Sequence, residues 1–145
     1  MRKGSVSSYV VVASAAAILS LAVTSAIRTS GAQPAIAPPT QLLTQALSDL
    51  PGREVRISLL DRPPQAMSPP HRHPGHHTFG YVLEGTYEFA VDGGAPKTLK
   101  AGEVFYEPPG ALHSVSRNPS SDQRTKILVF MVADQKNPST VVEKP

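Results

Sequence analysis

The histidines of this 145-residue sequence are grouped in a way that could bind a metal ion. His71 and His73 are separated by one residue, and side chains two positions apart in an extended chain point to the same side. His76 and His77 follow closely, and the fifth histidine is His113. Imidazole nitrogens are common transition-metal ligands, so this pattern indicates a metal-binding role for the middle of the chain.

The segment around His71 resembles the first signature motif of the cupin superfamily, in which His-x-His is followed by a glutamate and then a glycine. His71, His73 and Gly85 occupy motif positions. Thr78 stands where the family has its glutamate, and the glycine that should precede the histidines is absent. The histidines of this motif are therefore present, but its carboxylate is not.

The segment around His113 resembles the second cupin motif, which runs from a glycine through Pro-x-Gly to a histidine and an asparagine. Gly102, Pro108, Gly110 and His113 fit the family spacing, and Asn118 falls one residue late. With both motifs, the resemblance covers residues 53–134. It implies a small single-domain cupin with a double-sheet jelly-roll barrel.

The resemblance also implies one bound divalent transition metal ion (Fe, Mn, Ni, Zn or Cu), with His71, His73 and His113 as ligands. Three imidazoles leave coordination positions open for water or substrate. Thr78 offers no anionic oxygen, so a fourth ligand must come from elsewhere or be water.

His76 and His77 are the two candidates for that fourth position. In a regular strand His76 shares the facing of Thr78 and His77 does not, but a bulge could turn His77 inward. Both alternatives remain open, together with three histidines plus water. Glu107 and Tyr106 could face the mouth of the barrel, where Glu107 would act as a base behind the metal ligands; the alternative is solvation at a sheet edge.

Alternating apolar and polar residues predict strands in much of the chain. The predicted strands are residues 53–61, 79–83, 86–91, 98–100, 104–106, a strand carrying His113, and 124–133. The strand at 124–133 is apolar enough to be buried on both faces. Four aromatic residues and one methionine are expected in the core: Phe79, Tyr81, Phe89, Phe105 and Met131. Short strands separated by turns predict an all-β sandwich or barrel.

One short helix is predicted before the barrel. Thr40 can cap it, and leucine and alanine recur at spacings of three and four up to Leu50, where Pro51 and Gly52 stop it. The predicted organisation is an N-terminal signal or anchor (residues 1–32), a linker and short helix (33–52), the barrel (53–134) and a flexible tail (135–145).

The N-terminus has the layout of a secretory signal peptide. Arg2 and Lys3 precede an uncharged run of 19 residues from Tyr9 to Ile27, and small residues follow. This predicts export to a periplasmic or extracellular location, with no stable membrane insertion after cleavage. The alternative is an uncleaved N-terminal membrane anchor, because the run is nearly long enough to span a bilayer.

Charge and cysteine content narrow the functional classes. The net charge of +3 comes from Arg2, Lys3 and Arg28, and the remaining 11 basic residues are balanced by 11 acidic ones. The domain is therefore nearly neutral, and no nucleic-acid-binding patch is expected. The absence of cysteine excludes disulfides, thiolate ligands and a cysteine nucleophile.

Two functional classes remain. The first is a metal-dependent dioxygenase or isomerase acting on a small metabolite, and the second is a non-catalytic module that binds or senses a metal or small ligand. The fold cannot choose between them, because such barrels support many activities. A homodimer is compatible with either class.

Overall fold

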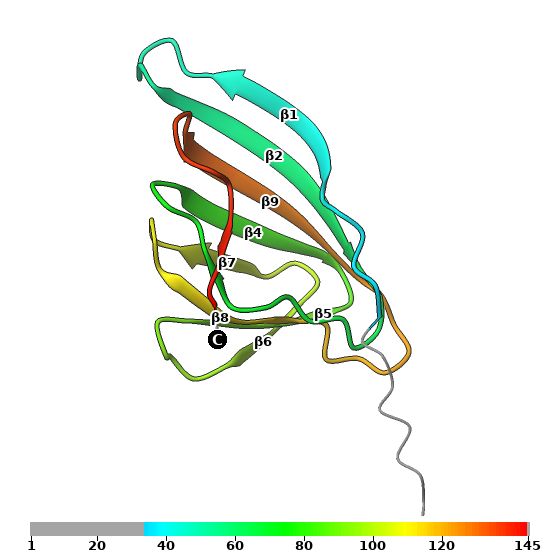
Figure 1. Cartoon of the computed structure of the whole chain (residues 1–145). Helices are drawn as coiled ribbons and strands as arrows, with labels where there is room; N and C mark the ends of the chain where they lie inside the picture. Colours follow the sequence, from blue (N-terminus) through cyan, green and yellow to red (C-terminus); the bar gives the residue numbers. More distant parts are fainter. Residues whose placement is uncertain (1–33, 145) are drawn as a thin grey trace, which may run out of the picture. The chain divides into compact units, whose positions relative to one another are not determined.

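The computed structural model describes residues 34–144, and the regular secondary structure within that range consists of ten β-strands. Their bounds are Thr40–Ala46 (β1), Arg53–Arg62 (β2), His71–Arg72 (β3), His77–Glu84 (β4), Thr86–Val91 (β5), Lys97–Lys100 (β6), Val104–Glu107 (β7), Leu112–Arg117 (β8), Thr125–Asp134 (β9) and Val141–Val142 (β10). They form two antiparallel five-stranded sheets (Figure 1). Sheet A has the order β1-β2-β9-β4-β7 and sheet B the order β10-β3-β8-β5-β6.

The strands predicted between residues 53 and 134 are present, and the all-β jelly-roll prediction is confirmed. The longest pairing joins β2 to β9, from Arg53 opposite Asp134 to Arg62 opposite Thr125. These strands are long because neither contains a proline or glycine that would interrupt the hydrogen-bond ladder.

The hydrophobic core takes its side chains from both sheets. Its buried members are Val82, Tyr87, Phe89, Phe105, Ile127 and Val129. Full burial of a large apolar side chain stabilises the fold by about 1.5–3 kcal/mol. Gly80 makes the packing possible, since a Cβ there would lie 2.0 Å from the Phe105 ring.

Two predictions about the core are wrong, because successive side chains of a strand point to opposite faces of the sheet. Phe79 and Tyr81 are 42% and 43% exposed, because Thr78, Gly80 and Val82 are the residues of β4 that point inward. β9 is likewise buried mainly on one face, with Phe130 37% exposed on the other.

The predicted helix over residues 40–50 is wrong. Residues 40–46 form β1, which pairs with β2 from Thr40 opposite Leu59 to Ala46 opposite Glu54. β1 ends at Ala46, and Pro51 and Gly52 belong to the turn that leads into β2, with Gly52 at φ +83°. The backbone ladder to β2 outweighs the helical spacing of the leucines, and Leu42 and Leu43 remain exposed.

Part of the segment predicted as a flexible tail has a defined place in sheet B. Val141 lies opposite Arg72 and Val142 opposite His71, so β10 extends the sheet beyond β3. The side chain of Arg72 also pairs with Glu143. The C-terminal segment thereby lies against the strand that carries the first histidine.

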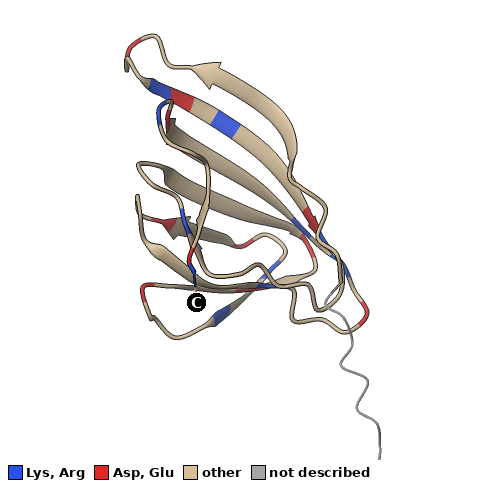
Figure 2. Cartoon of the chain, viewed as in Figure 1, with Lys and Arg blue, Asp and Glu red and all other residues tan. Residues whose placement is uncertain are grey.

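Charged residues are distributed over both sheets and their loops (Figure 2). Arg124 pairs with Asp61 at 2.8 Å and Lys126 with Glu84 at 2.9 Å. Exposed pairs of this kind contribute little to stability, because water and salt screen the attraction. No helix within residues 34–144 is long and apolar enough to cross a membrane, and the predicted signal or anchor lies outside the described residues.

Candidate metal centre

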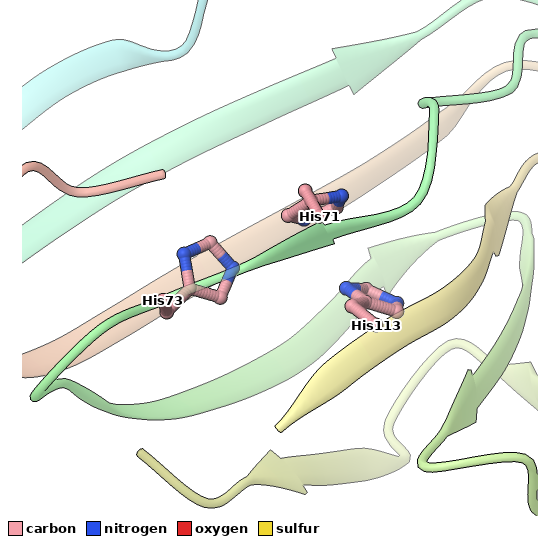
Figure 3. Close-up of side chains that lie close together, drawn as sticks. All are labelled: His71, His73 and His113. Atoms are coloured by element: carbon pink, nitrogen blue, oxygen red, sulfur yellow. The ribbon is translucent and has the colours of Figure 1, made fainter. Parts of the chain in front are cut away.

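Two neighbouring strands of sheet B bring three histidines together. β3 begins with His71, His73 follows its last residue, and β8 carries His113 directly opposite His71 (Figure 3). One ligand nitrogen from each ring lies within 4.8 Å of the other two. The three residues are only 9%, 6% and 3% exposed, so water competes poorly for these nitrogens.

Backbone carbonyls orient two of the three rings. Nδ1 of His71 lies 2.8 Å from the Pro69 carbonyl, and Nδ1 of His73 lies 2.5 Å from the Ser139 carbonyl. A carbonyl only accepts, so each Nδ1 carries the proton and donates it, which leaves the Nε2 lone pair free. Metal-binding histidines in proteins are commonly held in this way.

The third ring is oriented by a buried tyrosine. The Tyr87 hydroxyl lies 3.3 Å from His113 Nε2 and 2.7 Å from the Ser116 hydroxyl. Burial raises the pKa of Tyr87, so this hydroxyl stays protonated and available for hydrogen bonding at neutral pH. Nδ1 of His113 then faces the centre of the cluster.

Burial lowers the pKa of His71, and the proximity of His113 and His73 lowers it further, against the opposing effect of the Pro69 carbonyl. The neutral imidazole is therefore favoured. It is also the form that coordinates a metal.

Two polar side chains of sheet A project into the same region. Thr78 and Glu107 are register partners on β4 and β7 and are 1% and 2% exposed. Among the described residues, Thr78 Oγ1, Glu107 Oε2 and His113 Nδ1 are buried without a hydrogen-bond partner. Although Glu107 Oε2 lies 3.2 Å from His113 Nδ1, their orientation is not that of a hydrogen bond.

These unsatisfied atoms show that the site fits a metal ion. Buried polar atoms are normally satisfied, and a cluster of ligand-type atoms without partners is where a cation would complete the interactions. Three imidazoles with open positions beside them are typical of a centre that binds a further small molecule.

The other two histidines lie apart from this cluster. His76 is fully buried; its Nδ1 accepts the Asp134 N–H at 2.9 Å and its Nε2 donates to the Pro138 carbonyl at 2.9 Å. His77 lies outside the barrel, with Nδ1 2.9 Å from the Tyr106 hydroxyl and the two rings stacked. Of the five candidate ligands, the structure brings together His71, His73 and His113.

The inward position of Glu107 was only one of two alternatives in the sequence. Phe105 and Glu107 share the inner face of β7 and Tyr106 points outward, so the pair Tyr106 and Glu107 cannot both face the mouth. The alternation around the buried Phe105 is the signal that could have decided this.

Asn118 has a structural role that the sequence did not reveal. It is fully buried, and its Nδ2 donates to the carbonyls of Arg62, Pro63 and Gln123 at 3.2, 3.0 and 2.7 Å. It ties the end of β8 to the end of β2 and so closes that side of the barrel.

A cavity of about 490 Å³ opens beside the histidines. Apolar side chains form part of its wall, including Leu60, Phe105 and Met131, and the C-terminal segment contributes Ser139 and Thr140. The volume suits a small ligand.

Residues 58–131, about half of the chain, match the family model described as Cupin domain. This chain belongs to the cupin family. Its sequence is 38% identical over 71 residues to germin-like protein subfamily 2 member 2 of Arabidopsis thaliana, which covers 46% of this chain and 32% of that protein. The cupin thus spans about a third of the length of the curated relatives it matches.

Solved structures agree with this assignment. One of them is an oxalate oxidase in complex with the substrate analogue glycolate. The match covers 60% of this cupin and 45% of the oxalate oxidase chain, with a TM-score of 0.53 and 26% sequence identity. The match to the DMSP lyase DddQ of Ruegeria pomeroyi covers 74% of this cupin and 62% of the lyase chain, with a TM-score of 0.56. At 20% sequence identity it shows likeness of fold alone.

Proposed function

We propose that this cupin binds one divalent transition metal ion through His71, His73 and His113 and presents it to a small molecule in the adjoining cavity. The observation that carries the proposal is the convergence of three buried imidazoles, two of them with hydrogen bonds that leave Nε2 unprotonated. The likeness to germin-like proteins and to an oxalate oxidase supports it.

The activity we propose is that of a metal-dependent dioxygenase or isomerase acting on a small metabolite. A bound metal would supply Lewis-acid or oxygen-activating chemistry at its open positions. The chain itself would orient the ligand in the cavity, favour the neutral form of His71 and exclude bulk water. The likeness to an oxalate oxidase in complex with glycolate supports a small polar substrate.

A second function is a non-catalytic metal- or ligand-binding module. Thr78 favours it, because this residue replaces the carboxylate of the first cupin motif and offers no anionic ligand at that position.

We also propose that the domain is exported to the periplasm or the extracellular space. The basic, apolar and small-residue layout of residues 1–32 supports this, and retention of the segment as an anchor is the alternative.

Elemental analysis of the tag-free domain tests the metal proposal. We expect about one transition metal ion per chain, and loss of that ion in the His71→Ala/His113→Ala double variant. Iron would direct the next assay to oxygen consumption, whereas zinc or nickel would direct it to isomerisation or ligand binding. Absence of metal after reloading with each of these ions would contradict the proposal.

A further inference from the structure

Glu107 is a buried carboxylate beside two histidines of the cluster. It is 2% exposed, and within residues 34–144 no lysine or arginine forms an ion pair with it. Its Oε2 lies 3.2 Å from His113 Nδ1 and 3.6 Å from His73 Nε2. Burying a carboxylate is costly unless it is paired or coordinates a metal, so this arrangement needs an explanation.

The position of Glu107 is related to the missing carboxylate of the first motif. Thr78, which stands at the motif's glutamate position, lies directly opposite Glu107 in the pairing of β4 with β7. Side chains of directly opposed residues on neighbouring strands point to the same face at the same level. The carboxylate of Glu107 therefore enters the barrel at the level where the motif's glutamate would, and the short Thr78 side chain leaves room for it.

We propose that Glu107 is the carboxylate ligand of this metal centre, supplied from β7 in place of the glutamate that β4 lacks. This inference rests on the proposed function, since it requires the metal to be held by the three histidines. The ligand set becomes three neutral imidazoles and one carboxylate. Such a mixed set suits metals such as Mn²⁺ and Fe²⁺, which take oxygen as well as nitrogen ligands.

The rival role for Glu107 is an ion pair with a protonated histidine. The two roles predict opposite effects on the metal-free protein. An ion-pair partner would stabilise it, so Glu107→Gln would lower its melting temperature. A ligand that awaits its metal is an uncompensated buried charge, so Glu107→Gln would leave that temperature unchanged or raise it.

The test compares Mn²⁺ binding by Glu107→Gln with binding by the parent and by Glu84→Gln, using electron paramagnetic resonance titration. Glu84 is the matched control, because it is an exposed glutamate whose partner is Lys126. Loss of a ligand should weaken Mn²⁺ binding by at least the ~10–100-fold seen when supporting residues around metals are removed. Glu84→Gln should bind as the parent does.

A second variant returns the carboxylate to the strand where the family has it. Thr78→Glu combined with Glu107→Gln should recover most of the lost Mn²⁺ affinity, because the two positions are opposed across the same face. If the double variant does not fold, Glu107→Asp replaces it, and the shortened side chain should give an intermediate affinity.

Weaker Mn²⁺ binding by Glu107→Gln, with an unchanged or higher metal-free melting temperature, supports the ligand role. Unchanged binding while His71→Ala loses the metal would overturn this role and leave the three-histidine site intact. Weaker binding with a lower metal-free melting temperature would assign Glu107 to the ion pair. A parent protein that binds no metal would overturn both the ligand role and the proposed function.

A separate observation concerns the chemistry of the ligand. Arg62 is 9% exposed and lines the cavity that contains the three histidines. No carboxylate of the described residues forms an ion pair with it, whereas Arg56, on the same cavity wall, pairs with Glu54 at 2.5 Å. Burial lowers the pKa of Arg62, as expected for a charge that has lost water without gaining an anion.

We infer that the cavity takes a small carboxylate, with Arg62 as its charge partner. This rests on the cavity being the ligand site of the proposed function, but not on the role of Glu107. An arginine offers two parallel N–H donors that match a carboxylate, and a buried arginine without a protein partner is available for such a contact.

Calorimetric titration of the Mn²⁺-loaded protein with malonate, and with the neutral analogue malonamide, tests this inference. Arg62→Gln should weaken malonate binding by about 10-fold or more, the effect of losing a charge-assisted pair, and Arg62→Lys should weaken it less. Arg124→Gln is the matched control, because Arg124 is exposed, pairs with Asp61 and does not line the cavity; it should change malonate binding little. Malonamide should not bind. Equal binding of malonate by the parent and Arg62→Gln, or no binding by the parent, would overturn the inference.

Discussion

His71 and His113 face each other across β3 and β8, and each contributes one nitrogen to the proposed centre. A three-ligand site loses its geometry when one ligand is removed, so we expect His71→Ala or His113→Ala to lower transition-metal affinity by roughly two orders of magnitude or more. Metal titration checks this. His77→Ala is the control, because His77 contacts Tyr106 outside the barrel. Metal content equal to the parent in both ligand variants would contradict the assignment.

Asn118 connects the end of β8 to the end of β2 through its side chain. Its side-chain amide is fully buried and donates hydrogen bonds to three backbone carbonyls. Asn118→Ala would remove a hydrogen bond from each of these carbonyls, although that of Pro63 keeps the Ala66 N–H as a donor, and we expect a loss of about 2–4 kcal/mol in the free energy of unfolding. Urea denaturation measures it. Ser121→Ala, at an exposed position, should lie within about 0.5 kcal/mol of the parent.

At the scale of elements, the C-terminal strand β10 holds one side of the histidine site. It pairs with β3 at His71, and the preceding Ser139 accepts a hydrogen bond from His73. Glu143→Pro removes the backbone N–H that donates to the Pro70 carbonyl at 2.9 Å, so it should weaken this pairing, free the segment and loosen both histidines. We expect metal affinity to fall several-fold with little loss of overall stability.

The control for this prediction is Glu143→Gln, which keeps the backbone of the segment and weakens only the contact with Arg72. Its metal affinity should stay close to that of the parent. If Glu143→Pro binds metal as tightly as the parent, β10 has no part in positioning the ligands.

At the scale of the whole molecule, stability should depend on pH through buried histidines. His76 uses Nδ1 to accept from the Asp134 N–H, and burial is the main cause that lowers its pKa. The unfolded chain, with a histidine pKa of about 6.5, then binds the proton more readily than the folded protein. Stability is complete above about pH 6.5 and declines as the pH falls through the lowered pKa of the folded state.

We therefore expect the melting temperature of the metal-free protein to fall between about pH 7 and pH 5. His76→Asn keeps an acceptor near Asp134 but cannot be protonated, so its melting temperature should fall less steeply. Thermal melts across this range measure both slopes, with His77→Asn as the control. Identical slopes for the parent and His76→Asn would show that another group controls the acid sensitivity.

Export also concerns the chain as a whole. If residues 1–32 are a signal peptide, the mature protein should begin in the small-residue zone between about residues 27 and 38. N-terminal sequencing of the secreted form checks this. An intact Met1 in the membrane fraction would establish the anchor alternative.

The sequence by itself determined much of the barrel. Strands such as β2 and β5 could be predicted because their alternation of apolar and polar residues depends only on local spacing. The cupin motifs also predicted that His71, His73 and His113 lie together, because the spacing of a family motif reflects contacts that a single sequence does not show.

Only the tertiary structure decided the features that depend on a distant strand. Residues 40–46 have a helical spacing of leucines, yet β2 offers them a hydrogen-bond ladder. The C-terminal segment looked featureless because its partner, β3, lies about 70 residues earlier in the sequence. The same reason explains Glu107: its place opposite Thr78 and beside His113 follows from the pairing of β4 with β7 across a barrel, a relation that local spacing does not contain.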